Sequence, residues 1–395
     1  MKKVLVLNCG SSSIKYQLYD NNYKTLVEGL IERIGESEPR LIHEKNGKEL
    51  KRDVKVKNHK QGIKLMLELL HDDEWGAIKR VTEISVVGHR VVHGGQMDKS
   101  ALVSDVALGY LEDFQILAPL HNPHNITGIK EAKKAMPTVP QVMVFDTEFH
   151  QTMPRKAYMY GLPYQFFDKY AVRKYGFHGM SHKYVSLRSG ELLKKRKPNV
   201  ITCHMGNGVS LTAVKNGESV DTSMGMTPLE GVMMGTRTGD FDPSVLQYLV
   251  KRYKKKYDEL FEIANHKSGL LGISGVSKDM RVIHGRAKKG NERCKLAKEV
   301  YCYRIAKYIG SYAVALKKVD AIVFTAGAGM NAPYLRSEIC DYLKIIGVKL
   351  DERKNKKAIG KEAIISSNDS KIKVFVIPTD EELMIARQAV DVISK

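Results

Sequence analysis

Apolar strands and tight turns alternate in the first 30 residues of the chain. Residues 3–10 (KVLVLNCG) form an apolar run that ends in a polar turn, and residues 13–20 (SIKYQLYD) alternate apolar and polar positions. A short DNN turn leads into residues 23–30 (YKTLVEGL), which have the pattern of a third strand. Runs of this length, bounded by Asn, Asp and Gly, predict β-strands joined by hairpins. We therefore expect a three-stranded meander at the start of the chain.

The same pattern returns in the second half of the chain. Residues 199–208 (NVITCHMGNG) predict a strand ending in a glycine turn, and residues 209–214 and 218–223 predict two more strands around an Asn-Gly turn. In each half a helical segment precedes another apolar strand, at residues 142–149 (VMVFDTEF) and 321–329 (AIVFTAGAG). Self-similarity of this kind is typical of duplication. We expect a duplicated α/β domain, with independent use of common hairpins and helices as the alternative.

Helix signals complete this organisation. Residues 62–70 (GIKLMLELL) are apolar on one helical face. Ser181 is placed to cap a helix, and Thr379 with Glu382 three residues later fits a capping box for the last helix. Because no low-complexity linker separates the halves, we expect two domains that meet across a cleft, with the boundary near residues 147–155.

Composition and charge narrow the class of protein. The chain has 395 residues, 43% of them hydrophobic and 27% charged, which is ordinary for a soluble globular protein of two domains. Lys and Arg outnumber Asp and Glu by 64 to 44, and the net charge of +20 favours anionic partners. The basic runs at 51–60, 194–197, 251–256 and 353–357 lack aromatic interleaving and match no nucleic-acid-binding motif. We interpret them as solvated surface or as steering for small anions, and expect no nucleic-acid partner.

The cysteines and the apolar runs indicate the compartment. Five cysteines without a CxxC pair are typical of free thiols in a reducing cytoplasm. No apolar run approaches the ~20 residues that span a bilayer. The opening MKKVLVLNCG resembles a lipoprotein signal, but its apolar stretch at residues 4–7 is too short for a signal core. We expect a cytoplasmic protein with no membrane partner.

Two hairpin turns have the chemistry of phosphate binding. The first is N-x-G-S-S-S-x-K, from Asn8 to Lys15, where glycine exposes backbone N–H groups and the serines and lysine add donors and charge. The second is its repeat HMGNG, from His204 to Gly208. A plain hairpin is the alternative for each turn. Two such turns facing each other would hold a polyphosphate across a cleft.

Two arginines lie in glycine-flanked segments. Arg90 is in the apolar strand of GHRVVHGG (88–95), and Arg237 is in the loop MGTRTGDFD (234–242). A buried arginine needs a partner, and its planar guanidinium suits a carboxylate or phosphate held by two hydrogen bonds. A structural salt bridge is the alternative for either residue alone. Together the two arginines predict an anion clamp.

Histidines gather in the same glycine- and proline-rich segments. The spacing H-x-x-x-H occurs at 89/93 and at 178/182, which would suit zinc, but neither pair has a Cys partner or an HExxH motif. We therefore interpret His178 and His204 as donors to phosphoryl oxygens. Four others are expected to be structural: His89, His93, His124 and His182.

Carboxylates and a glycine turn follow other predicted strands. Asp146 ends one apolar strand, and Glu381 and Glu382 follow the strand at 373–378. Carboxylates in this position commonly hold Mg²⁺, directly or through water, whereas the alternative for the two glutamates is helix N-terminal charge. The turn TAGAGMN (325–331) would let a base or ribose approach the backbone.

Ten motifs, in order, resemble those of the acetate kinase family. They are VLVLNCGSSSIKY, VGHRVVHGG, LAPLHNP, VFDTEFHQTMP, RKYGFHGMSH, CHMGNG, DTSMGMTPLEG, MGTRTGDFDP, VFTAGAGMN and IPTDEEL, and they cover essentially the whole chain. The family belongs to the actin-like phosphotransferase superfamily. The resemblance implies an α/β fold of duplicated actin-like (ribonuclease H-like) domains with a central cleft. It implies one domain at residues 1–148, with the last helix (380–395) packing back on it, and a second at 149–379 that carries the nucleotide site and the dimer interface.

The resemblance implies reversible phosphoryl transfer between ATP and acetate, giving ADP and acetyl phosphate by direct in-line transfer. The implied cofactor is Mg²⁺, with Mn²⁺ as an alternative, and the implied assembly is a homodimer. A carboxylic acid with a pKa of about 4 is already ionised at pH 7, so the reaction needs no strong base. It needs two anions brought together and charge stabilised on the phosphoryl group, which explains arginines, histidines and a metal.

The resemblance also implies a role for each matching residue. Arg90 would hold the substrate carboxylate, Arg237 would hold the phosphoryl group, and His178 would donate to the transition state. The other implied catalytic residues are Asp146, Asn207 and His121, and the implied metal ligands are Asn8 and Glu381. The implied acyl pocket is formed by Val92, Leu120, Phe177 and Pro228. The implied contacts to the phosphates are Ser11, Ser13, Lys15, His204, Gly206, Asn207 and Gly208, and those to the nucleoside are Gly327, Ala328, Gly329 and Asn331.

Three positions depart from the family pattern. Glu148 stands where a small residue is usual, and we expect its side chain to point into solvent. Met330 stands where the nucleotide loop usually has Glu, which leaves the phosphoryl donor open, and Met180 replaces a small polar residue near His178. The alternatives are a propionate or butyrate kinase, an acetate kinase with another donor such as pyrophosphate, and an actin-like scaffold or chaperone ATPase. The acyl-pocket residues argue against butyrate, and the paired arginines argue against a scaffold.

Overall fold

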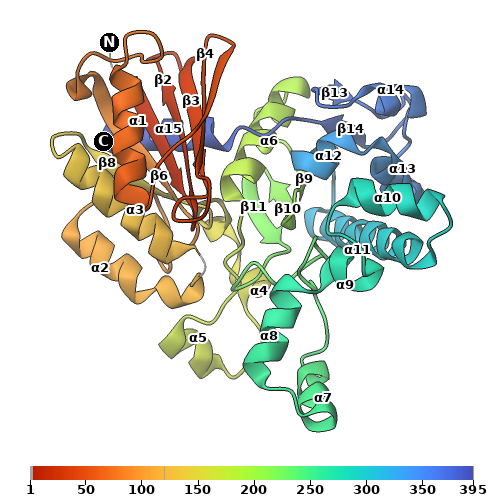
Figure 1. The fold of residues 1–395 in the computed structure, drawn as a ribbon. Coiled ribbons are helices and arrows are strands. Elements are labelled where there is room, and N and C mark those ends of the chain that lie inside the picture. Colours follow the sequence, from red (N-terminus) through yellow and green to blue (C-terminus); the bar gives the residue numbers. More distant parts are fainter. Residues whose placement is uncertain (1–2, 120, 395) are drawn as a thin grey trace. The chain divides into compact units, whose positions relative to one another are not determined.

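The computed structural model describes residues 3–119 and 121–394. The chain forms two compact units, one of Met1–Glu148 with Asp380–Lys395 and the other of Phe149–Thr379 (Figure 1). Each unit has its own β-sheet and its own hydrophobic core. Among the described residues, no helix combines the length and the apolar character needed to span a bilayer.

The first unit is built on an eight-stranded sheet of order β5-β4-β3-β2-β1-β6-β8-β7. The strands β1 to β5 form consecutive antiparallel hairpins, whereas β6 and β8 continue the sheet in parallel with β1. The predicted meander is confirmed, and β4 and β5 extend it. The strands are β1 (Lys3–Cys9), β2 (Ser13–Tyr19), β3 (Thr25–Glu32), β4 (Arg40–Lys45), β5 (Lys48–Asp53), β6 (Ile84–Val91), β7 (Ala101–Leu102) and β8 (Gln141–Phe145).

Helices cover both faces of this first sheet (Figure 1). Val87 of β6 belongs to the core beneath α1 and α3, whereas a side chain at Gly88 would lie 2.9 Å from Cγ2 of Ile385 in α15. Because neighbouring strand residues face opposite ways, α15 packs on the other face. The amphipathic pattern predicted at 62–70 is confirmed in α1. The helices are α1 (His59–His71), α2 (Asp105–Asp113), α3 (Asn122–Ala135) and α15 (Glu381–Ile393).

The second unit has a six-stranded sheet of order β11-β10-β9-β12-β14-β13. Its strands are β9 (Val200–Met205), β10 (Val209–Lys215), β11 (Glu218–Thr222), β12 (Ala321–Thr325), β13 (Ala363–Ile364) and β14 (Lys373–Val376). Its helices are α4 (Arg155–Tyr158), α5 (Tyr164–Tyr170), α6 (Gly179–Leu192), α7 (Ser244–Tyr253), α8 (Tyr257–His266), α9 (Gly269–Ser274), α10 (Met280–Lys288), α11 (Glu292–Leu316), α12 (Ala326–Asn331), α13 (Pro333–Tyr342) and α14 (Glu352–Lys357).

The two sheets share one strand plan. An antiparallel meander, β1 to β3 or β9 to β11, is followed in sheet order by two parallel strands, β6 and β8 or β12 and β14. The predicted duplication is therefore confirmed. The predicted equivalence of residues 142–149 with 321–329 is wrong, because β12 pairs directly with β9 whereas β8 pairs with β6 rather than β1. The order of strands in a sheet depends on which strands pair, and this pairing cannot be predicted from two apolar runs of similar sequence.

Two predicted helix caps are also wrong. Helix α6 begins at Gly179 with His178 as its N-cap, so Ser181 lies inside the first turn. Helix α15 is capped by Asp380, whose carboxylate accepts a hydrogen bond of 2.9 Å from the Leu383 backbone N–H. A carboxylate and a hydroxyl are both good caps, and the local chain path selects between them.

Candidate active site

A half-buried ion pair forms the first half of the candidate site. Arg90 lies on β6, and Asp146 directly follows the neighbouring parallel strand β8. The Nε of Arg90 donates to Oδ1 of Asp146 at 3.1 Å, and Nη2 donates to Oδ2 at 2.8 Å. The carboxylate is only 2% exposed. Adjacent strand ends thus hold the arginine in the two-bonded geometry that suits a carboxylate.

Glu381, the first residue of α15, is the third charged group of this first half-site. Its Oε2 lies 3.8 Å from Nη2 of Arg90, the same nitrogen that Asp146 binds. Burial raises the pKa of Glu381 to about 7, Arg90 opposes this, and Asp146 adds to it. Burial disfavours the charge on Arg90, but Asp146 and Glu381 outweigh it and raise the pKa of the guanidinium. Two carboxylates therefore converge on one cation.

The Asn8–Lys15 turn lies at the neighbouring strand ends of this unit. The Gly10 backbone N–H donates to the Ser13 carbonyl at 2.9 Å, which closes the hairpin between β1 and β2. A side chain at Gly10 would lie 2.9 Å from Oγ of Ser13. Lys15 forms an ion pair with Glu382, so its charge is shared with the first turn of α15. Asn8 lies near the end of β1, and Ser11 lies on the turn that follows.

The second half-site is centred on two histidines of the second unit. His178 has a backbone φ of +56°, a left-handed conformation that costs energy for a residue with a side chain. Its ring stacks on that of His204 at a centroid distance of 4.1 Å. His204 is the penultimate residue of β9, and Oγ of Ser181 lies 2.8 Å from its Nδ1. The chain thus holds both rings at one end of the β9–β10 hairpin.

Gly208 leaves a gap between His178 and Arg237. A Cβ atom at Gly208 would lie 3.3 Å from Nη1 of Arg237 and 3.5 Å from Nε2 of His178. Both nitrogens therefore face one small space that any side chain would fill. Asn207 lies beside this gap, and its carbonyl accepts a hydrogen bond of 3.2 Å from Gly235.

Arg237 has no carboxylate partner among the described residues. Its Nη1 donates to the Pro228 carbonyl at 3.4 Å and lies 3.7 Å from Sδ of Met234, both neutral groups. Burial lowers the pKa of the guanidinium, because the charged form loses solvation. A half-buried cation in these surroundings fits an anionic ligand.

A cavity of about 700 Å³ lies in the second unit beside the same glycines. Five expected residues line it: Gly206, Asn207, Gly327, Ala328 and Asn331. The sequence did not predict the rest of the wall, which is formed by Gly235, Leu270, Lys278, Asp279, Met280, Arg281, Tyr301, Ala332 and Tyr334. Most of these come from α9 to α11, whose sequences carry no glycine motif, so only tertiary packing reveals them.

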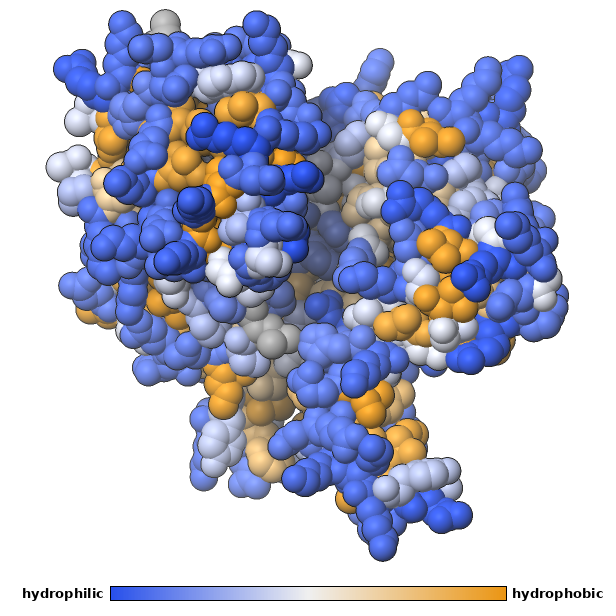
Figure 2. All heavy atoms as spheres, in the orientation of Figure 1, coloured by the Kyte–Doolittle hydropathy of each residue, from blue (hydrophilic) through white to orange (hydrophobic). Residues whose placement is uncertain are grey.

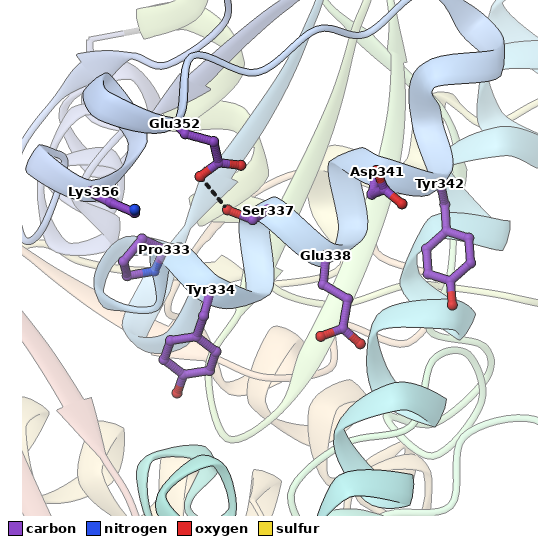
Figure 3. Close-up of a pocket in the computed structure, with 8 residues that line it drawn as sticks. All are labelled: Pro333, Tyr334, Ser337, Glu338, Asp341, Tyr342, Glu352 and Lys356. Atoms are coloured by element: carbon purple, nitrogen blue, oxygen red, sulfur yellow. Dashed lines mark hydrogen bonds between the residues drawn. The ribbon is translucent and has the colours of Figure 1, made fainter. Parts of the chain in front are cut away.

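Tyr334 also lines a second, open pocket of about 670 Å³ beside α13 and α14 (Figure 3). Its ring stacks flat on His284, with centroids 3.6 Å apart and ring planes 7° apart. The hydroxyl of Ser337 donates to Glu352 at 2.8 Å across this second pocket (Figure 3). Tyr334 is therefore a wall shared by both pockets.

The remaining expected residues are distributed between the two units. Val92 follows β6, and its backbone N–H donates to Oδ1 of Asn125 at 3.1 Å. Phe177 is buried next to His178, and His121 immediately precedes α3. Leu120 lies outside the described residues.

Glu148 does not point into solvent as expected. Its Oε2 accepts from the Ser100 backbone N–H at 2.9 Å, and its Oε1 accepts from Nε2 of Gln388 at 2.6 Å. The carboxylate therefore ties the loop before β7 to α15. The other two unusual residues, Met180 and Met330, are both buried, so neither adds an exposed side chain to the surface.

The histidines expected to be structural have protein partners. Nε2 of His89 lies 2.8 Å from Oε1 of Gln141, and the His93 Nδ1 accepts from Gly95 at 2.9 Å. His182 contacts two hydroxyls, and His124 stacks on His59. Within the described residues, no group of three or more His, Cys, Asp or Glu side chains is arranged to hold a metal ion.

The two sheets share one strand plan and pack against helices, an α/β architecture of the actin-like ATPase class. The chain belongs to the acetokinase family, whose model matches residues 3–387. Members of this family transfer a phosphoryl group to a carboxyl acceptor.

Relatives and solved structures of this family match the full length of the chain. A protein of Thermotoga petrophila named "Acetate kinase" is 52% identical over 100% of this chain and 99% of its own. A second, from Carboxydothermus hydrogenoformans, is 52% identical over 99% of each chain. The crystal structure of Porphyromonas gingivalis acetate kinase matches with a TM-score of 0.93 at 44% identity, covering 100% of both chains. A propionate kinase from Francisella tularensis matches with a TM-score of 0.93 at 41% identity, covering 99% of this chain and 100% of its own.

Proposed function

We propose that the protein is an acetate kinase, which transfers a phosphoryl group between ATP and acetate reversibly and with Mg²⁺. One observation carries the proposal: Arg237 is half-buried, has only neutral partners among the described residues, and faces the same gap as Nε2 of His178. Such a cation fits an oxyanion ligand better than a structural role. The relatives named acetate kinase at 52% identity support acetate as the acceptor.

The proposed chemistry is one in-line displacement. A carboxylate oxygen of acetate attacks the γ-phosphorus of ATP, the bond from that phosphorus to the β-phosphate oxygen breaks, and its electron pair leaves on ADP. Because acetate is already ionised at neutral pH, no side chain must remove a proton. Arg90 would orient the acetate carboxylate through its remaining N–H donors. Arg237 and the Nε2 of His178 would donate to the phosphoryl oxygens, where charge develops.

Asn8, Asp146 and Glu381 are the proposed metal-binding residues. The fit rests on the two carboxylates that converge on one nitrogen of Arg90, at 2.8 and 3.8 Å. Mg²⁺ prefers oxygen ligands and keeps several waters, so two carboxylates and phosphate oxygens suit it better than a protein cage. When bound, the ion neutralises charge on the phosphates.

The 700 Å³ cavity is the proposed nucleotide site. Gly327, Ala328 and Asn331 line it at the end of β12, where the chain turns into α12. Gly206 and Asn207 also line it, and Gly208 directly follows them in the chain. We propose that the nucleoside lies between α12 and α10, with its phosphates directed toward His204 and Arg237.

Propionate is the second candidate acceptor. The propionate kinase of Francisella tularensis has the same TM-score, 0.93, as the acetate kinase of Porphyromonas gingivalis. The fold therefore does not distinguish the two acids, which differ by one methylene. A hydrophobic pocket discriminates a single methylene only about 10- to 200-fold.

Trapping of acyl phosphate with hydroxylamine tests these proposals. Purified protein is incubated with Mg-ATP and acetate, propionate or butyrate in turn, and the best acid is repeated with GTP or pyrophosphate in place of ATP. We expect most product with acetate and ATP. Product only with a longer acid or another donor would move the function within the family, and no product with any pair would overturn the proposal.

An arginine variant with a matched control tests the anion clamp. We expect Arg237→Gln to abolish product formation while the protein still unfolds cooperatively. Arg188→Gln is the control, because this exposed arginine of α6 pairs with Glu191 and Glu362 at the surface. Equal activity in both variants would remove Arg237 from the site.

We further propose a cytoplasmic homodimer that binds neither nucleic acid nor membrane. All five cysteines are buried free thiols, which supports a reducing compartment. Exposed aromatic side chains gather on the second unit, among them Tyr248, Tyr257 and Phe261, and Figure 2 shows apolar side chains over α8 among hydrophilic ones. Sedimentation at several protein concentrations tests the dimer, and a monomer throughout would exclude it.

A further inference from the structure

Three hydrogen bonds connect His178 to the interior of the second unit. Nδ1 of His178 lies 2.9 Å from Oγ of Ser210, the same Oγ lies 2.7 Å from Nε2 of His182, and Nδ1 of His182 lies 2.7 Å from Oγ1 of Thr202. Ser210, His182 and Thr202 are fully buried. They come from β10, α6 and β9, so three elements of the unit fix the chain of contacts.

Proton counting restricts how this chain can be arranged. The pKa of His182 lies well below its usual value because of burial, and His150 and His204 lower it further, so its ring is neutral. A neutral imidazole donates from one nitrogen and accepts at the other, and each hydroxyl has one proton. The chain therefore runs either from Thr202 toward His178 or from His178 toward Thr202.

The direction toward His178 gives an acceptor to each proton of the three buried residues Thr202, His182 and Ser210. Thr202 then donates to Nδ1 of His182, Nε2–H of His182 donates to Ser210, and Ser210 donates to Nδ1 of His178. In the opposite direction the Thr202 hydroxyl proton would have no acceptor among the described residues. A buried donor left without an acceptor is costly, so the first direction is favoured.

We propose that Ser210 and His182 are positioning residues that fix the tautomer of His178 with its proton on Nε2. This inference rests on the proposed function for the role of Nε2, which faces the gap at Gly208 together with Nη1 of Arg237. Because Ser210 donates to Nδ1, the single ring proton must be on Nε2. The ring then presents a fixed donor to a phosphoryl oxygen, and no proton transfer is needed.

An arginine and two other histidines surround His178. His204 stacks on it at 4.1 Å, Arg237 faces it across the Gly208 gap, and His182 lies behind Ser210. In this arrangement Arg237 would supply positive charge to the phosphoryl group, and the N–H of His178 would supply a hydrogen bond of fixed direction.

Nitrogen NMR of the full-length protein labelled with ¹⁵N-histidine tests the inference without any substrate. Near pH 7.5 we expect the His178 signals to show a bare Nδ1 and a protonated Nε2, with Ser210→Ala shifting the ring toward the other tautomer. Ser181→Ala is the matched control, because this buried serine contacts His204 instead. A wild-type ring protonated on Nδ1, or an unchanged ring in Ser210→Ala, would overturn the inference.

Kinetics provide the second readout. We expect Ser210→Ala to lower kcat about tenfold or more with KM for ATP and acetate nearly unchanged, because only the donor orientation is lost. The isosteric Thr202→Val should shift the tautomer in the same direction and leave the fold intact. Higher KM values with an unchanged kcat would contradict a positioning role. If the wild-type protein made no acetyl phosphate, the proposed function would fail. The NMR experiment would still test the hydrogen-bond chain from Thr202 to His178.

Discussion

Arg90 and Arg237 occupy similar sequence contexts but different surroundings in the structure. Asp146 binds Arg90 through two hydrogen bonds, whereas Arg237 contacts only neutral groups among the described residues. Under the proposed function, a substrate at Arg90 would therefore use the N–H donors that Asp146 leaves, and Arg237 would gain a full counter-charge from the ligand. The sequence predicted an anion clamp from both residues. It did not predict this difference, because the hydrogen-bond partner of each arginine depends on contacts between segments far apart in the chain.

Gly208→Ala tests the gap between Arg237 and His178. The added methyl would lie 3.3 and 3.5 Å from the two ligand-facing nitrogens, in the space proposed for a phosphoryl group. We expect kcat/KM to fall about a hundredfold, because a displacement of about 1 Å at a reacting group has this effect. Gly109→Ala in α2 meets no atom within 4 Å and is the control. Retained activity in Gly208→Ala would place the phosphoryl group elsewhere.

His89 gives a pH prediction. Burial lowers its pKa to about 4, although the hydrogen bond with Gln141 opposes this. Between the unfolded value of about 6.5 and pH 4 the unfolded chain binds the extra proton, so the free energy of unfolding falls as the pH falls through this window. The linkage amounts to about 2 kcal/mol between pH 7.5 and 5. Urea unfolding of His89→Gln at both values should show a smaller loss than wild type, and an equal loss would show that His89 does not contribute.

At the scale of elements, Arg336 of α13 anchors the proposed nucleotide loop. Its side chain is fully buried, and its guanidinium donates to the carbonyls of Gly329, Met330, Asn355 and Ala358 and to Oδ1 of Asn355. The end of α12 is thereby fixed to α14. All five acceptors are neutral, so Arg336 acts through hydrogen bonds rather than through an ion pair.

Arg336→Lys should therefore not preserve the loop. Lysine has three donors at one point and cannot reach five acceptors in a plane. We expect a loss of about 3 kcal/mol or more in the free energy of unfolding, because a hydrogen bond to a charged group contributes about 1.5–3 kcal/mol and lysine must lose at least two of the five. The KM for ATP should rise more than the KM for acetate. Wild-type stability and a wild-type KM for ATP in Arg336→Lys would show that the loop holds its shape without this anchor.

At the scale of the whole molecule, the proposed ligands divide between the units. The nucleotide cavity is lined only by residues of the Phe149–Thr379 unit, whereas Arg90, Asp146 and Glu381 belong to the other unit. Each unit has its own sheet and core. Under the proposed function, phosphoryl transfer would need residues of both units, whereas nucleotide binding would need residues of one.

Hydrogen exchange can measure this division. We expect ADP alone to slow exchange in the segments that line the cavity, such as residues 270–281 and 327–334. Adding acetate and Mg²⁺ should extend the protection to β6 and β8, because Arg90 and Asp146 would then bind ligand. Protection of β6 and β8 by ADP alone, with none near the cavity, would reverse the assignment of the two half-sites.

The strand-and-turn pattern, the duplication and the family could be predicted from the sequence, because hydrophobic period, turn residues and ordered motifs are local properties. The sequence also pointed to Arg90, Asp146, His178 and Arg237 through their glycine-flanked or strand-end positions. The tertiary structure decided that β12 corresponds to β6, that Glu148 binds Ser100 and Gln388, and that Arg237 has only neutral neighbours. The hydrogen-bond chain behind His178 and the cavity lining contributed by the segment from α9 to α11 could likewise not be predicted from the sequence. They depend on contacts between segments far apart in the chain, which packing alone brings together.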